Sequence, residues 1–445
     1  MSMLDIFKPP PHIKEIKDPK VVKRKYRYWR IRTFYSMYMG YAFYYFSRKS
    51  FTLATPSMIV DLGLDKFQIG MLGSILSLTY GLSKFISGIM SDRSNPRYFM
   101  SIGLILTGIF NIFFGFSSTF LLFAIFWGLN GWFQGWGWPP CGKLLTHWYS
   151  QSERGRWWSI WNTSHNVGAF VLAMIGAPLV QYFGWRYTME IPGIACIIIG
   201  LFLINRLRDT PRSLGLPAIE KYRNDYPTSK HEKSRYRLST KEILFKYVLK
   251  NKYIWILTVA YFFIYVIRQA INEWTILFLV EEKGASKLVA GSSLIWFEIG
   301  GFLGSLVAGW GSDFLFKSRR GPINVLFTVG LLITLYTMWR FTGGIILIDF
   351  IFVFFLGFFV FGPQMLIGVA AAELSHKKAV GTATGFIGWF AYLGAAMAGG
   401  PLGVILDKKN GWENFFIILI VCSIIALLFL LPLWKVKAIS DPIES

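Results

Sequence analysis

Long apolar stretches alternate with short polar ones along almost the whole chain. Each of twelve such stretches approaches or exceeds the roughly 20 residues that a helix needs to cross a bilayer. They lie near 31–60, 66–90, 98–117, 120–144, 156–180, 186–205, 252–280, 288–314, 322–342, 345–372, 379–406 and 413–434. The apolar runs are continuous and do not alternate with polar positions, which argues against transmembrane β-strands. The pattern predicts an all-α membrane protein with twelve transmembrane helices.

A polar segment at 206–251 divides these spans into two sets of six. It contains three prolines, and thirteen lysines and arginines are counted from Arg206 to Lys252. Nothing in it resembles a catalytic domain, so it is interpreted as a linker. The expected organisation is a basic N-terminus at 1–30, helix bundles at 31–205 and 252–434 on either side of the linker 206–251, and a tail at 435–445.

The composition fits a membrane protein and the charges predict its orientation. Hydrophobic residues make up 54% of the chain and charged residues only 16%, which is too few to cover a soluble protein of this length. The net charge of +22 comes from lysines and arginines that lie mostly in alternate loops. If both termini are cytoplasmic, the inner segments hold 35 of these residues and the outer loops hold seven. This bias predicts cytoplasmic termini and explains the charge without a nucleic-acid partner.

Residues that could bind a metal or catalyse a reaction are sparse. The three cysteines lie inside apolar stretches, too scattered for a metal site or a disulfide framework. No nucleotide-binding motif and no paired histidine ligands occur. We therefore expect no cofactor, no metal and no enzymatic activity. A membrane phosphatase remains a weaker alternative, because His165 has no partnered acid or nucleophile at helical spacing.

The two halves repeat a turn motif and an intramembrane arginine. The turn after span two runs from Gly88 through Asp92 and Arg93 to Arg97, and the turn after span eight has Gly309 and Asp313 at the same spacing. Arg48 precedes Asp92 by 44 positions and Arg268 precedes Asp313 by 45. Two pseudo-symmetric six-helix bundles are expected, with a binding site on the axis between them. The turns are interpreted as a conformational latch; the alternative is ordinary basic inner loops. The latch residues are Asp92, Arg93, Arg97 and Asp313.

Arg48 and Arg268 lie inside apolar spans, where a charged side chain costs about 2.5–3.5 kcal/mol. Such residues indicate function, and the planar guanidinium suits the oxygen atoms of phosphate. The sequence therefore predicts a cavity that binds a tetrahedral anion. The alternatives are that each arginine forms a buried ion pair, for which Glu273 and Glu298 are candidate partners of Arg268, or extends to the membrane surface.

Other polar residues share the faces of these arginines at helical spacing. Tyr41 and Tyr45 precede Arg48 by seven and three positions, and Tyr265 precedes Arg268 by three. For the tyrosines the alternative is simple packing, for Lys84 a pairing with Asp92 or Glu298, and for His165 a hydrogen bond between helices. The remaining predicted cavity residues are Lys84, His165, Tyr80, Trp161, Asn162, Asn166 and Tyr392.

Several segments carry a resemblance to a known family. They are Gly40-Tyr41 with Arg48-Lys49, Tyr80-Gly-Leu-Ser-Lys84-Phe, Phe133-Gln-Gly-Trp-Gly-Trp138-Pro-Pro-Cys-Gly142, Trp161-Asn-Thr-Ser-His165-Asn-Val-Gly168 and Phe361-Gly-Pro-Gln-Met-Leu-Ile-Gly368. Through them the chain resembles the organophosphate:phosphate antiporter family of the major facilitator superfamily over nearly its whole length. The runs 87–100 and 206–217 are similar to the hexose-6-phosphate branch.

This resemblance implies a major facilitator fold in which Arg48 and Arg268 bind the phosphoryl group. It also implies that a cavity is lined by Lys84, His165, Tyr41, Tyr45, Tyr80, Asn162, Tyr265 and Tyr392. Phe361 stands where the family often has tyrosine, so a hydrogen bond is not expected there.

The resemblance further implies a function. A secondary transporter would exchange hexose 6-phosphate, above all glucose 6-phosphate, for inorganic phosphate by alternating access. Proteins of this branch act as sensors in some bacteria and as transporters in others, so the alternative is a receptor for external hexose phosphate that signals to a membrane histidine kinase. The expected location is the bacterial inner membrane, where the chain would contact lipid as a monomer.

Overall fold

The computed structural model describes residues 8–92, 94–225, 243–317, 319–341, 346–375 and 380–436. Across these ranges the chain forms helices joined by turns, with no strand. Ten helical segments are long and apolar enough to cross a membrane, and they correspond to all the predicted spans except the first and fourth. The prediction of an all-α membrane protein is therefore confirmed.

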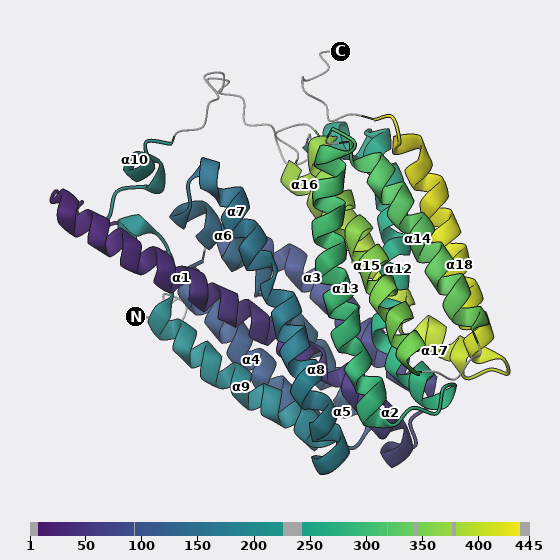
Figure 1. Ribbon diagram of the computed structural model, residues 1–445. Coiled ribbons are helices and arrows are strands. Elements are labelled where there is room, and N and C mark those ends of the chain that lie inside the picture. Colours follow the sequence, from purple (N-terminus) through teal and green to yellow (C-terminus); the bar gives the residue numbers. More distant parts are fainter. Residues whose placement is uncertain are drawn as a thin grey trace. The chain divides into compact units, whose positions relative to one another are not determined.

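The elements follow one another along the chain as labelled in Figure 1. In the first part they are α1 (Pro19–Arg48), α2 (Ser50–Leu62), α3 (Lys66–Asp92), α4 (Pro96–Phe116), α5 (Phe120–Gln134), α6 (Trp138–Trp148), α7 (Gln151–Asn162), α8 (Ser164–Phe183), α9 (Trp185–Arg206), η2 (Pro211–Leu214), α10 (Ile219–Arg223) and η3 (Ile243–Leu249). In the second part they are α12 (Lys252–Glu281), α13 (Lys287–Phe314), α14 (Arg320–Arg340), α15 (Ile346–Glu373), α16 (Val380–Met397), α17 (Gly400–Leu406), α18 (Gly411–Leu430) and η5 (Leu431–Leu433).

Polar caps fix where several of these helices begin. The carboxylate of Asp18 accepts hydrogen bonds from the backbone N–H groups of Lys20 and Val21, and Pro19 occupies the first turn of α1. Asn95 caps α4 in the same way, with Pro96 at the first helical position. Such caps satisfy N–H groups that have no partner within the helix. Helix α1 consequently starts twelve residues before the apolar stretch at 31–60, and its first half is strongly basic.

Four predicted spans are each built from two consecutive helices. Span one is α1 and α2, span four is α5 and α6, span five is α7 and α8, and span eleven is α16 and α17. The breaks fall at Lys49, at 135–137, at Thr163 and at 398–399. At Lys49 and Thr163 the backbone keeps right-handed helical dihedral angles, whereas at Gly399 it departs from them. Arg48 and His165 lie within two residues of two of these breaks.

The described residues form two compact units by their contacts. Unit 1 comprises 8–51, 82–172 and 186–225, and unit 2 comprises 52–81, 173–185 and the described residues from 243 to 436. Unit 1 has a core in which Tyr41, Trp148 and Trp161 are almost fully buried. The first part of α3 therefore packs with the second half of the sequence.

Unit 2 is held together by very close helix packing. Helices α13 and α15 run side by side (Figure 1). A Cβ atom added at Gly300 would lie 2.0 Å from the carbonyl oxygen of Phe354, and one at Gly304 would lie 2.0 Å from that of Phe358. Only glycine allows this approach of two helix backbones, which is a common basis of association between membrane helices.

The start of the polar segment at 206–251 folds back onto the N-terminal residues within unit 1. The backbone N–H of Ile13 donates to the carbonyl of Arg212 at 3.0 Å, and that of Ile16 donates to Gly215 at 2.8 Å. Tyr26 stacks on Tyr222 with 3.9 Å between ring centroids. These contacts hold the segment from Pro211 to the end of α10 against the N-terminal residues.

Glu153 joins this layer to the helices of unit 1. Its carboxylate lies 2.7 Å from Arg30 and 2.9 Å from Arg223. Partial burial opposes ionisation of Glu153, but the hydrogen bonds from Arg223 and Arg30 outweigh it and lower its pKa to about 2. The ionised form is therefore the one that stabilises the fold.

We predict that Glu153→Gln lowers the thermal stability of the purified protein in a pH-dependent manner. Because the pKa in the folded state is depressed, the stabilisation is complete above the unfolded value of about 4.3 and is lost as the pH falls toward 2. A loss of about 1–2 kcal/mol is expected near neutral pH once solvent screening is allowed for. Melting curves of both proteins should converge in acid; a gap that stays constant from about pH 6 to pH 3 would contradict this account.

Candidate functional site

Arg48 is the last residue of α1, and an aromatic side chain lies on one side of it. Its guanidinium carbon lies 4.5 Å from the ring centre of Tyr45, which is within the range of a cation–π interaction. Tyr45 precedes Arg48 by three residues, so the helix itself brings the two together. The arginine is half-buried.

A chain of buried amides fixes the position of Arg48. The Nε group of Arg48 donates to the side-chain oxygen of Gln134, whose own amide donates to Asn130. Asn130 in turn donates to Asn111 at 3.3 Å and to the carbonyl of Thr107 at 2.9 Å. All three amide residues are at most 1% exposed. Because buried amides need fully satisfied hydrogen bonds, this chain of α5 and α4 residues determines the direction of the guanidinium.

An aromatic path connects Arg48 with the second predicted cation of unit 1, Lys84. The ammonium of Lys84 lies 5.2 Å from the ring centre of Trp138. From Trp138 the ring contacts continue through Trp158 at 5.9 Å to Trp161 at 5.9 Å, and from Trp161 to Tyr41 at 4.7 Å. Trp161 is fully buried and packs against Tyr41.

His165 lies beside the same group of aromatic residues, immediately after the α7–α8 break. Its ring centre is 5.2 Å from that of Tyr45. Its Nδ1 contacts the backbone carbonyl of Asn162, and since a carbonyl only accepts, Nδ1 carries the proton of this hydrogen bond. Nε2 then accepts a hydrogen bond from a hydroxyl in the neutral form and donates one to an anion when protonated. The side chain of Asn162 is exposed and that of Asn166 is half-buried.

Unit 2 contains a corresponding group around Arg268 on α12. The guanidinium carbon lies 5.5 Å from the ring centre of Tyr265 and 5.2 Å from that of Phe361. Phe361 therefore offers Arg268 the face of a ring where a tyrosine would also offer a hydroxyl. The ring centre of Tyr392 lies 5.6 Å from that of Tyr265 and 4.9 Å from that of Tyr80. Three predicted tyrosines from α12, α16 and α3 thus form one group.

Acidic residues are also buried in unit 2. Glu273 is 8% exposed and Glu298 is 3% exposed. The amide of Gln269 donates to the carboxylate of Glu273 at 2.7 Å. These two carboxylates are the ion-pair partners that the sequence offered for Arg268. The hydrogen bond from Gln269 gives Glu273 a neutral partner on the same helix.

The predicted latch residues have different surroundings. Arg320 lies 2.7 Å from Asp313 and 2.8 Å from Glu373, so it joins the ends of α13, α14 and α15. Arg97 donates to the carbonyl of Ile204 near the end of α9. Arg93 and the side chain of Asp92 lie outside the described residues.

Sequence reasoning missed several residues that the structure connects with the site. The amides of Gln134, Asn130 and Asn111 carry no charge and were passed over, although Asn130 and Gln134 are four residues apart on one helix face. Tyr261, four residues before Tyr265, donates to the backbone carbonyl of Gln364 at 3.0 Å. Its spacing from Tyr265 and Arg268 is the signal that places it on the same face.

An all-helical membrane fold with cationic side chains inside apolar helices is typical of secondary transporters, and comparison with known proteins agrees. Residues 37–399 match the model of the Major Facilitator Superfamily. The chain belongs to this superfamily and, within it, to the organophosphate:phosphate antiporter branch. Its fold is the twelve-helix fold of that superfamily, and membership of a transporter family confirms that it is not an enzyme.

Individual relatives cover nearly the whole chain. It is 58% identical to the probable hexose phosphate transport protein of Chlamydia trachomatis over 97% of this chain and 96% of that one. It is 48% identical to the membrane sensor protein UhpC of Escherichia coli over 97% of this chain and 98% of that one. A solved structure of a bacterial homologue of the lysosomal transporter Spinster, inward-facing and unoccupied, has a TM-score of 0.73 at 15% identity, covering 92% of this chain and 97% of that one. This last likeness concerns the fold alone.

Proposed function

We propose that the protein exchanges hexose 6-phosphate, above all glucose 6-phosphate, for inorganic phosphate by alternating access. The observation that carries the proposal is a guanidinium in each unit, Arg48 and Arg268, each within an apolar helical setting and beside phenolic side chains. The name of one relative, a probable hexose phosphate transport protein, adds the substrate class.

In this proposal Arg48 and Arg268 each bind phosphoryl oxygens, with Lys84 adding a further positive charge. The hydroxyl and amide groups hydrogen-bond the sugar or the phosphate, and Nε2 of His165 serves either, depending on its protonation. Bound anion offsets the positive charge in a water-poor environment, so the empty carrier changes conformation slowly and exchange is coupled. The other binding residues of this proposal are Tyr41, Tyr45, Tyr80, Asn162, Asn166, Tyr265 and Tyr392, and Trp161 supports Tyr41.

We also propose that the protein lies in a bacterial inner membrane as a monomer with both termini in the cytoplasm, as its basic loops favour. On that side Asp313 with Arg320, and Asp92 with Arg93 and Arg97, would stabilise one conformation. The second candidate function is a receptor for external hexose phosphate that signals to a membrane histidine kinase. It is favoured by the similarity to a sensor protein.

Counterflow in proteoliposomes tests the proposal and separates it from the receptor. Vesicles loaded with inorganic phosphate should take up labelled glucose 6-phosphate, and vesicles without internal phosphate should not. Labelled glucose should be excluded in both cases, and the accumulated sugar phosphate should be recovered intact. Saturable binding of glucose 6-phosphate without uptake would establish the receptor instead. Absence of both binding and uptake would overturn the two functions together.

A further inference from the structure

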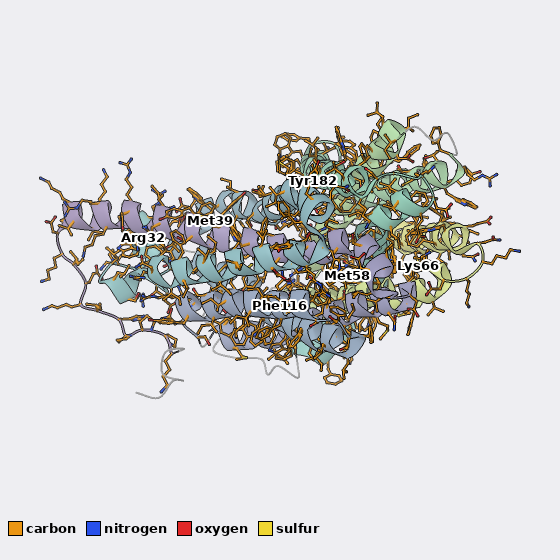
Figure 2. All side chains as sticks on the ribbon, turned by 90° about the horizontal axis from the view of Figure 1, so that it is seen from below. Arg32, Met39, Met58, Lys66, Phe116 and Tyr182 are labelled. Atoms are coloured by element: carbon orange, nitrogen blue, oxygen red, sulfur yellow. The ribbon has the colours of Figure 1, made fainter. Side chains whose placement is uncertain are left out.

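A strongly basic groove is lined by the first half of α1 and by the end of α9. It has a volume of about 650 Å³. Figure 2 shows side chains with nitrogen tips around the part of α1 that carries Arg32. Six cations line the groove: Lys20, Lys23, Arg24, Arg27, Arg32 and Arg206. We call it the α1–α9 groove.

Ion pairs do not balance these cations among the described residues. Within the described ranges, no salt bridge joins any of the six to a carboxylate. Arg32 donates to the amide oxygen of Asn205 at 2.8 Å, which ties α1 to α9, while its buried Nε has no hydrogen-bond partner among these residues. Behind the groove Arg208 stacks on Trp29 at 4.8 Å. Partial burial, together with the charges of Arg97 and Arg32, lowers the pKa of Arg208. The groove is therefore a site of concentrated positive charge that an anion would stabilise.

Apolar surface accompanies the charge. Tyr28 and Ile31 are 51% and 56% exposed, and they share the basic face of α1 at helical spacing. On α9, whose apolar span ends at Arg206, an exposed stripe of Ile191, Ile194, Ile198 and Leu201 leads toward the groove. The stripe recurs every three or four residues, so it lies along one face of the helix. A ligand with a charged end and a long apolar part fits this arrangement.

We propose that the α1–α9 groove binds the phosphodiester headgroup of an anionic phospholipid from the surrounding membrane. Guanidinium and ammonium groups recognise the phosphate oxygens. The headgroup lies where the α9 span ends at Arg206, and the acyl chains lie along the exposed isoleucines and leucine within that span. Free phosphate shares the headgroup chemistry but has no apolar part that could contact the stripe on α9. This difference distinguishes the two ligands. The proposal does not rest on the transport activity.

The test measures thermal unfolding of the purified full-length protein in neutral detergent during lipid titration. Dihexanoylphosphatidylglycerol should raise the melting temperature in a saturable manner, because a ligand of the native state stabilises it. Dihexanoylphosphatidylcholine should have no such effect. The variant Lys23→Gln/Arg24→Gln/Arg27→Gln should lose at least about tenfold in apparent affinity for the anionic lipid. The control Lys250→Gln/Lys408→Gln/Lys409→Gln removes the same charge elsewhere and should respond as the wild type does.

Two further arms complete the experiment. In the first arm, inorganic phosphate replaces the lipid, and the shift in melting temperature of the triple variant is subtracted from that of the wild type. This subtraction cancels phosphate binding at other sites. A difference as large as that for the lipid would assign the groove to free phosphate and overturn the proposal. Equal responses to both lipids, or of both triple variants, would also overturn it. If the triple variant does not survive extraction, Arg27→Gln alone should weaken lipid binding about threefold, and native mass spectra should lose the retained anionic lipid.

Discussion

Replacing either intramembrane arginine by lysine should reduce phosphate-linked counterflow by about 10- to 100-fold while leaving the protein folded. In the proposed function, the planar guanidinium of Arg48 and that of Arg268 each donate two parallel hydrogen bonds to phosphoryl oxygens, whereas lysine would offer only a compact charge. Losing one hydrogen bond to a charged group costs about 1.5–3 kcal/mol, which corresponds to that range of affinity.

The measurement is initial uptake of labelled glucose 6-phosphate into phosphate-loaded vesicles at several substrate concentrations. Arg340→Lys is the matched control, because Arg340 is exposed at the end of α14 beside Trp339. It should exchange at the wild-type rate. If Arg48→Lys or Arg268→Lys retains more than half of the wild-type exchange, that arginine does not bind the phosphoryl group as proposed.

The amide chain that orients Arg48 leads to a related prediction for Gln134. Gln134→Met keeps the volume of the side chain but removes the acceptor for Nε of Arg48 and the donor to Asn130. Arg48 keeps its positive charge but loses the hydrogen bond that orients its guanidinium. We therefore expect a smaller defect than in Arg48→Lys, seen mainly as a raised apparent KM for the sugar phosphate. A defect confined to melting temperature would mean that Gln134 serves stability alone.

The helical spans could be predicted from the sequence because twenty apolar residues in a row have few alternatives in a membrane protein. The breaks within four of them could not. At Lys49 and at Thr163 the backbone stays close to helical values, so the apolar pattern continues across each break without a signal. The basic first half of α1 was likewise not predicted as helix, because its cap at Asp18 lies far outside the apolar stretch.

The candidate site could be predicted only where a residue was conspicuous by charge or by spacing. Arg48 and Arg268 stood out as charges in apolar surroundings, and Tyr45 and Tyr265 followed from helical spacing. Their assigned roles remain predictions. The contacts of Gln134 with Arg48, of Tyr80 with Tyr392 and of Arg320 with Glu373 join residues far apart in the sequence. Such pairings depend on how helices pack, and a single sequence contains no measure of that.

A contact between helices far apart in the sequence, α3 and α16–α17, underlies the second prediction with a large expected effect. In unit 2 the first half of α3 lies against the α16–α17 break. A Cβ atom at Gly70 would be 2.4 Å from the carbonyl oxygen of Gly399. Ser74 donates to the carbonyl of Ala396 at 2.5 Å and accepts from the backbone N–H of Gly400 at 2.9 Å. We call this contact the α3–α16 closure.

A polar cluster holds the same end of α3. The ammonium of Lys66, labelled in Figure 2, lies 2.7 Å from Glu281, which also accepts a hydrogen bond from Trp412 at 3.0 Å. The carboxylate of Asp407 accepts from the backbone N–H groups of Lys66 and Phe67 at 3.1 and 2.9 Å. If transport proceeds by alternating access, these contacts belong to one conformation and separate in the other.

Gly70→Ala should therefore bias the protein toward the conformation in which the α3–α16 closure is open. The added methyl group meets backbone, which cannot move aside as a side chain can, and overpacking of this kind costs about 1–3 kcal/mol. That cost falls on the closed conformation alone, so the ratio of the two should change by about 5- to 150-fold. Exchange should slow accordingly, since each cycle requires closure.

Thiol labelling reports this shift directly. Ser77 on α3 is 5% exposed, and a cysteine placed there should react slowly with a water-soluble maleimide in the wild-type background and much faster alongside Gly70→Ala. Cys141, Cys196 and Cys422 are buried, so their background is small. Gly368→Ala is the control, because a Cβ atom added there would have no described atom within 4 Å. Equal labelling rates in the two glycine variants would show that the α3–α16 closure does not open during the cycle.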